Sequence, residues 1–253
     1  MKETHRSIRA RQGKGRAAQR KTRGRPARDS SLALSREKIV KAAIRIVDQD
    51  GLSALSMRRL GALLGVDPMA IYHHLPNKAA LYDAIVEAVM AEMDLGRGPA
   101  RAAPSEAPPR ERLMQMARSY RDALLSHPNA LPVVATRPVR TPASLRPIER
   151  MLAVIAGLGF TPLESIAFVD VCGHFIMGWA QTYAAHLHGS ELHDHGPVPI
   201  DELPPEEFPN LHRLLLETPS DNPFAEEFEL GMSAILNGLL AASAKHGRGG
   251  VQA

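Results

Sequence analysis

Apolar side chains recur every three or four residues over residues 35–94, which is the spacing of one face of an α-helix. The first such run holds Ile39, Val40, Ala43, Ile46 and Val47. Ser35 precedes the run and Gly51 follows it, and these residue types are favoured at the N-cap and just past the C-terminus of a helix. The pattern therefore predicts a first helix between Ser35 and Gly51.

A tight turn between two short helices is expected at Gly65. Ser56 is placed to cap the first of them, which carries Leu60. Gly65 can adopt the left-handed conformation that such a turn needs, and Asp67 with Pro68 then restarts a helix as its N-cap and first residue. Two helices joined in this way are common in DNA-binding proteins but are not restricted to them.

The third predicted helix, from Pro68 to about His74, has a poor apolar face, since only Ile71 and Leu75 are expected to point inward. The residues expected on its outer surface are Met69, Ala70, Tyr72, His73 and His74. Such a helix would add little to a core, but small, aromatic and imidazole side chains suit insertion into the major groove of DNA. The third helix therefore favours a DNA-binding function.

The remaining pattern is also helical. Asn77 is expected to cap a fourth helix with core positions at Leu81, Ile85, Val89 and Met93. Proline and glycine are then frequent over residues 95–109, which indicates a flexible linker. Apolar periodicity beyond it predicts helices at about 110–127, 144–158, 162–187 and 223–245. The predicted fold class is all-α, with a three-helix helix-turn-helix domain and connecting helix over residues 35–94 and a C-terminal helical domain over residues 110–247.

The N-terminal arm, residues 1–34, is expected to be disordered because it has almost no large apolar side chain to bury. Residues 1–30 hold eleven Lys or Arg and two acidic residues, whereas the rest of the chain has twenty basic and twenty-five acidic residues. A basic arm on a mildly acidic body indicates a polyanionic partner, with nucleic acid as the first candidate.

Arg23 and Arg25 belong to an Arg-Gly-Arg-Pro sequence that resembles an AT-hook core. Such a core lies in the narrow minor groove of A·T-rich DNA. The tetrapeptide is short, so non-specific neutralisation of phosphates by the arm is the alternative.

Several other classes of protein are disfavoured. Cys172 is the single cysteine, so neither an internal disulfide nor a cysteine-ligated zinc site is available, and a cytoplasmic location is expected. We expect neither export nor a membrane span, because no signal-like segment and no apolar run of about eighteen uncharged residues are found. We expect no enzyme, cofactor or bound metal, because no HExxH, GxSxG or P-loop motif occurs.

Residues 53–85 read SALSMRRLGALLGVDPMAIYHHLPNKAALYDAI and contain the pattern G-V-x(5)-Y-x-H. Further short stretches are ALLSH at 123–127, TRP at 136–138, GHF at 173–175 and FELGMSAILNGL at 228–239. In these stretches, and over almost everything beyond the arm, the chain resembles the tetracycline-repressor family. The resemblance implies a transcriptional repressor that leaves its operator when a small molecule binds the C-terminal domain. Activation is an alternative, because its sign depends on where the operator lies relative to a promoter.

For DNA binding, the family pattern places Arg58 at the edge of the groove and Lys78 against a phosphate. It places along the recognition helix the five residues Met69, Ala70, Tyr72, His73 and His74. Packing of Tyr72 and His74 beneath the helix is the alternative for those two residues. Pro68 stands where tetracycline-binding members carry a base-reading amide, and proline offers no donor. The resemblance therefore implies a different operator.

For the ligand, the family pattern supplies Thr136, Arg137, Pro138 and His174, with Met116, Tyr120, Met151 and Met177 around them. A structural role at a helix end is the alternative for Thr136 and Arg137. Val133 and Thr182 stand where tetracycline-binding members hold magnesium and its water through a histidine and a carboxylate. We therefore expect a rather apolar organic ligand instead of a magnesium–tetracycline chelate.

The two longest predicted helices, 162–187 and 223–245, are the candidates for self-association. Their apolar residues include Phe168, Val171, Phe175, Leu230, Ile235, Leu236 and Leu239, and Gly231 and Gly238 would permit close approach. In the family such helices form a four-helix dimer interface; burial in the core of one chain is the alternative. A homodimer is favoured, because paired recognition helices about 34–36 Å apart can read a palindromic operator.

A metal-responsive repressor is the main alternative for the signal. His186, His188, His193 and His195 lie close together around Asp194, and histidine is a common metal ligand. Gly189, Ser190 and Gly196 instead indicate an exposed loop. A DNA-packaging protein is a further alternative, which the basic arm would suit and a discriminating recognition helix would not.

Overall fold

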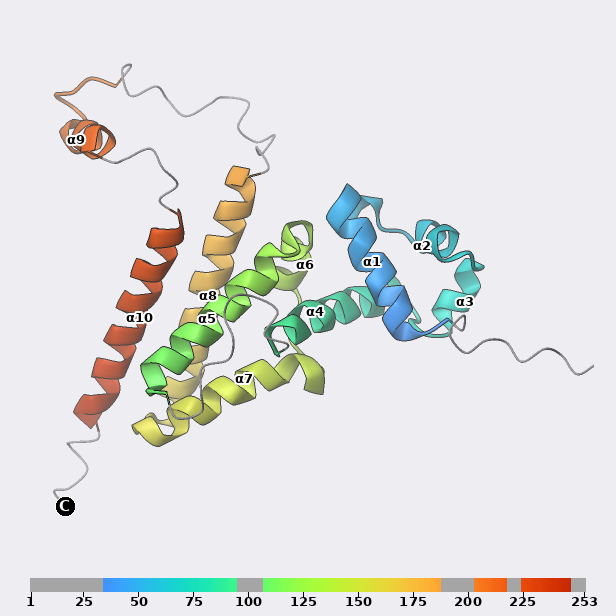
Figure 1. Cartoon of the computed structure of the whole chain (residues 1–253), viewed down its shortest axis with the longest axis horizontal. Coiled ribbons are helices and arrows are strands. Elements are labelled where there is room, and N and C mark those ends of the chain that lie inside the picture. Colours follow the sequence, from blue (N-terminus) through green and yellow to red (C-terminus); the bar gives the residue numbers. More distant parts are fainter. Residues whose placement is uncertain (1–33, 95–106, 188–202, 218–223, 247–253) are drawn as a thin grey trace, which may run out of the picture. The chain divides into compact units, whose positions relative to one another are not determined.

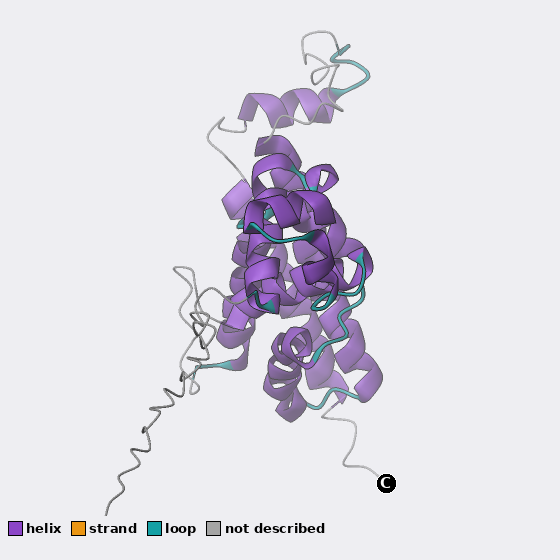
Figure 2. Cartoon of the chain, turned by 90° about the vertical axis from the view of Figure 1, so that its right-hand side faces the viewer, coloured by secondary structure: helices purple, strands orange, loops and turns teal. Residues whose placement is uncertain are grey.

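The computed structural model describes residues 34–94, 107–187, 203–217 and 224–246. Its α-helices are α1 (Arg36–Asp50), α2 (Met57–Leu64), α3 (Pro68–Tyr72), α4 (Lys78–Asp94), α5 (Pro109–Leu125), α6 (Leu131–Thr136), α7 (Pro142–Ile155), α8 (Pro162–Leu187), α9 (Pro209–Glu217) and α10 (Phe224–His246) (Figure 1). Short 3-10 turns are η2 (Leu52–Ala54), η3 (Pro128–Ala130) and η4 (Ala156–Leu158). The described residues include no strand (Figure 2), which confirms the predicted all-α class.

The first helix begins and ends as the sequence predicts. The Ser35 hydroxyl accepts a hydrogen bond from the Lys38 N–H, and Gly51 ends α1 with a φ of 78°. The apolar face of α1 is buried at the predicted positions Ile39, Val40, Ala43, Ile46 and Val47. On the other side, Arg36 forms an ion pair of 2.7 Å with Glu87, which joins α1 to α4.

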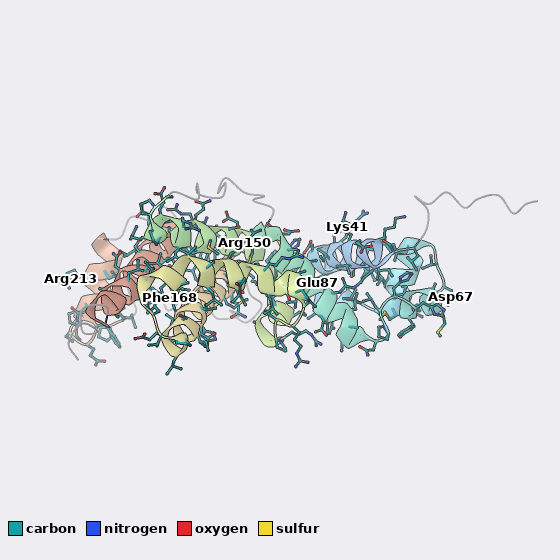
Figure 3. All side chains as sticks on the ribbon, turned by 90° about the horizontal axis from the view of Figure 1, so that it is seen from below. Lys41, Asp67, Glu87, Arg150, Phe168 and Arg213 are labelled. Carbon is teal, nitrogen blue, oxygen red and sulfur yellow. The ribbon has the colours of Figure 1, made fainter. Side chains whose placement is uncertain are left out.

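The turn between α2 and α3 also follows the prediction. Gly65 adopts the left-handed conformation with a φ of 66°. The Asp67 carboxylate, at the start of α3 (Figure 3), accepts a hydrogen bond from the Met69 N–H at 2.8 Å, with Pro68 as the first helical residue. The angle at which α3 leaves α2 is therefore fixed by local backbone chemistry.

Gly61 is a second glycine on which the helix-turn-helix depends, and sequence reasoning did not single it out. A Cβ atom at this position would lie 2.9 Å from the carbonyl oxygen of Val66 and 3.2 Å from Cγ of Pro68. Because the nearest atom belongs to the backbone, no rotamer change can relieve the contact. Glycine is required here for α2 to lie against the start of α3.

The C-terminal helices agree with the predicted ones to within a few residues, except that α6 and α9 were not predicted. Both helices are short. In α6, with six residues and Pro132 in its first turn, the apolar spacing is too brief to indicate a helix. The core of this part includes the fully buried Phe168 on α8 (Figure 3) and Phe228, Met232 and Leu236 on α10. Phe168 and Leu236, which were candidates for the dimer interface, are thus buried in the core of one chain, which was the alternative prediction.

The helices α8 and α10 lie side by side (Figure 1) and approach each other closely at Gly231. A Cβ atom on Gly231 would lie 2.5 Å from the ring of Phe175. The close approach predicted for Gly231 is therefore found between helices of one chain. At Gly238 no atom lies within 4 Å of such a Cβ.

By length and mean hydropathy α8 is long and apolar enough to cross a membrane, which the search for an uncharged apolar run did not indicate. One face of α8 is buried in the core at Phe168, Cys172, Ile176 and Ala180. Asp170, His174 and Gln181 interrupt its apolar surface. This amphipathic division is that of a helix packed within a helical protein.

Candidate DNA-binding surface and ligand cavity

The short helix α3 buries only Ile71, and Leu75 is buried just beyond its end. On its outer side Met69 is 64% exposed and Tyr72 is 39% exposed. His73 and His74 are also exposed, and Ala70 is half-buried. The structure therefore places Tyr72 and His74 on the surface instead of beneath the helix.

Two basic side chains flank α3. Arg58 is exposed on α2, whereas the neighbouring Arg59 forms an ion pair with Asp50. Lys78 is exposed as the first residue of α4, and its ammonium lies 5.3 Å from the centre of the Tyr82 ring. A lysine at a helix N-terminus is suited to a phosphate, because the free backbone amides there also attract anions. We call Arg58, Met69, Ala70, Tyr72, His73, His74 and Lys78 the recognition surface; the predicted Arg23 and Arg25 lie outside the described residues.

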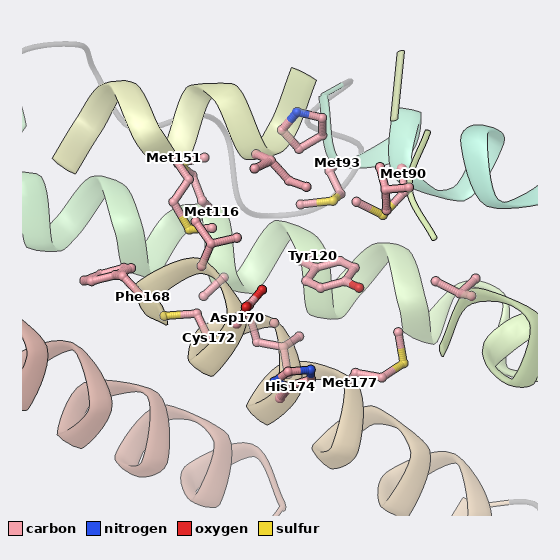
Figure 4. Close-up of a pocket in the computed structure, with 18 of the residues that line it drawn as sticks. Met90, Met93, Met116, Tyr120, Met151, Phe168, Asp170, Cys172, His174 and Met177 are labelled. Carbon is pink, nitrogen blue, oxygen red and sulfur yellow. The ribbon is translucent and has the colours of Figure 1, made fainter. Parts of the chain in front are cut away.

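A cavity of about 400 Å³ lies between α4 and the C-terminal helices. Its wall holds six methionines: Met232 and the five labelled in Figure 4, which are Met90, Met93, Met116, Met151 and Met177. This volume is within the range of drug-sized ligands. Methionine side chains are flexible and polarisable, so they adapt to ligands of irregular shape. We call this site the methionine cavity.

The polar groups in the wall of the methionine cavity are few. They are contributed by Tyr120, Arg137, Asp170 and His174, and Tyr120 lies near the middle of the lining (Figure 4). Burial raises the pKa of Tyr120 to about 12, so its hydroxyl stays protonated at neutral pH and can donate a hydrogen bond. Burial likewise raises the pKa of the Cys172 thiol to about 12, which makes Cys172 an apolar wall residue instead of a nucleophile.

Most of the predicted ligand-binding residues come together in this cavity: Met116, Tyr120, Arg137, Pro138, Met151, His174 and Met177 line it. Thr136 is not among the lining residues; it is exposed, and its hydroxyl donates to the carbonyl of Pro132 at 2.6 Å. Met90, Met93 and Asp170 also line the cavity but were not predicted. Their spacing is that of ordinary core or surface positions, so the sequence alone offers no signal for them.

Arg137 joins the cavity to the N-terminal part of α4. It lines the cavity, and its Nε donates to Asp83 at 2.6 Å while its Nη2 donates to the carbonyl of Ala79 at 3.2 Å. Its guanidinium also lies 5.7 Å from the centre of the Tyr82 ring. Arg137 therefore holds the first turns of α4 against the end of α6, so it has a structural role at a helix end as well as a place in the cavity.

A second junction lies at the other end of α4. Nδ1 of His127 is 2.9 Å from the Asp48 carboxylate, and its Nε2 is 3.3 Å from that of Glu92. Asn129 donates to the backbone carbonyl of Asp48 at 3.1 Å. The segment around η3 thus contacts both α1 and α4 at this junction.

The described residues include no cluster of three or more side chains suited to a metal ion. Val133 is buried on α6, and the Thr182 hydroxyl donates to the carbonyl of Gly178 at 3.0 Å. Of the four histidines in the candidate metal-binding loop, His186 lies among the described residues. His188, His193 and His195 lie outside them.

An exposed recognition helix in a helix-turn-helix, followed by a helical domain that encloses a cavity, defines a DNA-binding regulator of transcription. Residues 39–85 match the bacterial regulatory proteins of the tetR family, and residues 103–243 match the tetracyclin repressor-like C-terminal domain. The second match alone covers more than half of the chain, so the protein belongs to the tetR family of regulators.

Individual proteins with similar sequences and a solved structure with a similar fold also belong with this family. The chain is 29% identical over 229 residues to the HTH-type transcriptional repressor DrrR1 of Streptomyces coeruleorubidus, covering 85% of this chain and 80% of that protein. It is 26% identical over 206 residues to the class D tetracycline repressor protein of Escherichia coli, covering 81% and 88%. The structure of ActR from Streptomyces coelicolor in complex with actinorhodin is similar with a TM-score of 0.68 and 27% identity, covering 83% of this chain and 99% of that one.

Proposed function

We propose that this protein is a cytoplasmic repressor that binds a palindromic operator as a homodimer and leaves it when a small, largely apolar organic molecule fills the methionine cavity. The observation that carries the proposal is the position of Arg137. This residue lines the cavity and also contacts α4 at Ala79 and Asp83, next to the predicted phosphate contact Lys78. A molecule in the cavity is thereby one side chain away from the recognition surface.

The DNA-binding part of the proposal rests on the recognition surface. Met69 and Ala70 can contact thymine methyl groups, and Tyr72, His73 and His74 can reach base edges or phosphates. Arg58 supplies a donor at the groove edge, and Lys78 supplies a cation at a helix N-terminus. Pro68 offers no base-reading donor, which supports an operator different from that of the tetracycline repressors.

The homodimer is supported by a second exposed surface, which we call the α8–α10 face: Leu163, Ile166, Val171, Gly178, Leu230 and Gly238. Leu163 is 77% exposed and Leu230 is 75% exposed. Exposed leucines beside small residues suit close packing of helices from a second copy. A two-fold dimer would also place two recognition helices to read a palindrome.

The nature of the ligand is inferred from the wall chemistry. The six methionines favour an apolar body, and the Tyr120 hydroxyl offers a hydrogen bond. The ActR complex with actinorhodin supports an organic ligand in a related fold. Val133 and Thr182 provide no replacement for the magnesium-binding groups of tetracycline repressors.

The test is footprinting of the full-length protein on DNA fragments, including the region upstream of its own gene, followed by addition of candidate organic compounds. Protection of one or a few palindromes, relieved by a compound, is the expected result. Uniform protection of all fragments would instead indicate a DNA-packaging protein and contradict the proposal. A promoter fused to a reporter then distinguishes repression from activation by the direction of the change.

A further inference from the structure

The contacts of Arg137 make it a shared residue between the methionine cavity and α4. Its Nε and Nη2 donate to Asp83 and to the carbonyl of Ala79. A guanidinium has further N–H donors, in a planar fork that matches a carboxylate or a similar anion. Arg137 is also part of the cavity wall, so we expect an anionic group at this end of the cavity to reach these remaining donors.

The part of α4 that Arg137 holds is also the part that carries Lys78. Two cations lie near the Tyr82 ring: the Lys78 ammonium is 5.3 Å and the Arg137 guanidinium 5.7 Å from its centre. Ala79, whose carbonyl accepts from Arg137, follows Lys78 directly. We therefore expect a change in the position or pairing of Arg137 to alter the surroundings of Lys78 through Ala79 and the Tyr82 ring.

We propose that the effector is an apolar molecule with an acidic group, and that this group competes with Asp83 for Arg137 and so loosens the first turns of α4. The inference rests on the proposed function, whose ligand class and switching step it specifies. A second anion on one guanidinium repels the Asp83 carboxylate and weakens its pairing. The effect is reciprocal: the Asp83–Arg137 contact weakens ligand binding by the same free energy by which the bound ligand weakens that contact.

The charge distribution of the cavity also orients such a ligand. Asp170 lines the same cavity and would repel an acidic group, whereas Arg137 attracts one. The acidic group is therefore expected at the Arg137 end. The apolar body is then expected to lie along the methionines.

A pair of dyes tests the role of the acidic group directly. Anilinonaphthalene sulfonate has an apolar aromatic body and an anionic sulfonate, and phenylnaphthylamine has the same ring systems without the sulfonate. Both are expected to bind the methionine cavity of the full-length protein and to fluoresce there. The sulfonate dye alone is expected to speed amide hydrogen exchange over residues 79–84, because it alone competes for Arg137.

Three variants separate competition from simple occupancy. Asp83→Asn is expected to tighten binding of the sulfonate dye by about threefold, a modest change because Asp83 and Arg137 are partly exposed at 44% and 26%. Arg137→Gln is expected to weaken it by a similar factor and to abolish the change in exchange. Arg140→Gln, an exposed arginine in the same segment that is not among the lining residues, should change neither result. None of these variants should alter binding of the neutral dye.

A cavity-filling variant, Gly173→Leu, distinguishes failure of this inference from failure of the proposed function. Gly173 lines the cavity, and a Cβ atom there meets nothing within 4 Å. Loss of dye binding in this variant identifies the cavity as the binding site. If the variant lowers dye binding but both dyes speed exchange equally, or Asp83→Asn binds the sulfonate dye unchanged, competition for Arg137 is wrong while the ligand cavity stands. Unaltered binding of both dyes in Gly173→Leu would overturn the ligand cavity itself.

Discussion

Two surfaces of this protein expose large apolar side chains, but their surroundings differ. On the recognition surface, Met69 and Tyr72 are 64% and 39% exposed, and they lie on a short helix flanked by the cations Arg58 and Lys78. On the α8–α10 face, Leu163 and Leu230 are 77% and 75% exposed. There the adjoining residues include acidic and small ones, with Glu164 next to Leu163 and with Glu229 and Gly231 on either side of Leu230, in place of a flanking pair of cations.

The difference shows that exposure of apolar residues does not by itself identify the partner. An apolar surface beside cations is complementary to the methyl groups and phosphates of DNA. An apolar surface beside small residues is complementary to another helix, since backbones can approach closely there. On this basis we propose DNA as the partner of α3 and a second copy of the chain as the partner of α8 and α10.

The largest effect is expected when the α8–α10 face is made charged. Leu230→Asp should prevent dimer formation, because an aspartate buried at such an interface lacks a partner. Operator affinity should then fall by about a hundredfold or more, since two linked recognition helices bind far better than one. Light scattering and fluorescence anisotropy measure the two effects. Leu145→Asp, an exposed leucine on α7, is the matched control, and a dimer that survives Leu230→Asp would contradict the assignment.

The next largest effect concerns the backbone that presents the recognition surface. Gly61→Ala should destabilise the helix-turn-helix by about 1–3 kcal/mol, because the added Cβ meets the Val66 carbonyl oxygen and strains the turn. Gly173→Ala is the control: its Cβ has space, so the better helix propensity of alanine should stabilise α8 by up to about 1 kcal/mol. Urea unfolding measures both. Equal stability of the two variants would show that the close approach at Gly61 is not required.

Single contacts on the recognition surface should have smaller and distinguishable effects. Arg58→Ala is expected to cost about 1–3 kcal/mol of operator binding and to relax one base preference. Lys78→Ala should weaken binding to all sequences alike and lower the salt dependence, as for a phosphate contact. Anisotropy on operator and scrambled DNA measures both, with Arg146→Ala on α7 as the control. Unchanged affinity of Arg58→Ala for both DNAs would remove Arg58 from the interface.

The smallest effect comes from an ion pair between α5 and α10. Arg118 donates to Glu229 at 2.8 and 2.6 Å, and these hydrogen bonds hold the pKa of Glu229 below its usual value. Because the folded pKa is the lower one, the pair stabilises the fold above the ordinary glutamate pKa, and this contribution is lost as the pH falls through the folded value. Both side chains are more than a third exposed, so the contribution should be below about 1 kcal/mol. Urea unfolding of Glu229→Gln should match the wild type in acid and be slightly less stable at neutral pH; a loss that persists in acid would point to packing instead.

Local features of this fold could be predicted from sequence, because capping and turn formation depend on residues a few positions apart. Ser35, Ser56, Asp67 and Asn77 cap the four N-terminal helices as predicted, and Gly65 takes the predicted left-handed conformation. Of the eight ligand-binding residues predicted from the family resemblance and its surroundings, seven line one cavity and Thr136 does not.

Features that depend on distant segments could not be predicted. The need for glycine at position 61 follows from how Val66 and Pro68 fold back on α2, and periodicity carries no information about that approach. Met90 and Met93 have the spacing of core residues, which does not distinguish a filled core from a cavity wall. The pairing of Arg137, just past the end of α6, with Asp83 on α4 joins residues 54 positions apart, and no local pattern indicates this contact.

The separation of two recognition helices in solution tests the central claim most directly. A spin label on Pro76→Cys, an exposed position just past α3, would report this distance, and the buried Cys172 should not react with the label. Double electron–electron resonance on the protein bound to its operator should give one distance between the two labels, about 34–36 Å, which is one turn of DNA. That distance should change when a cavity ligand releases the DNA. The account would be contradicted by the absence of a dipolar interaction between two labels, which would mean that no dimer forms. It would also be contradicted by a distance that is the same with operator and with ligand.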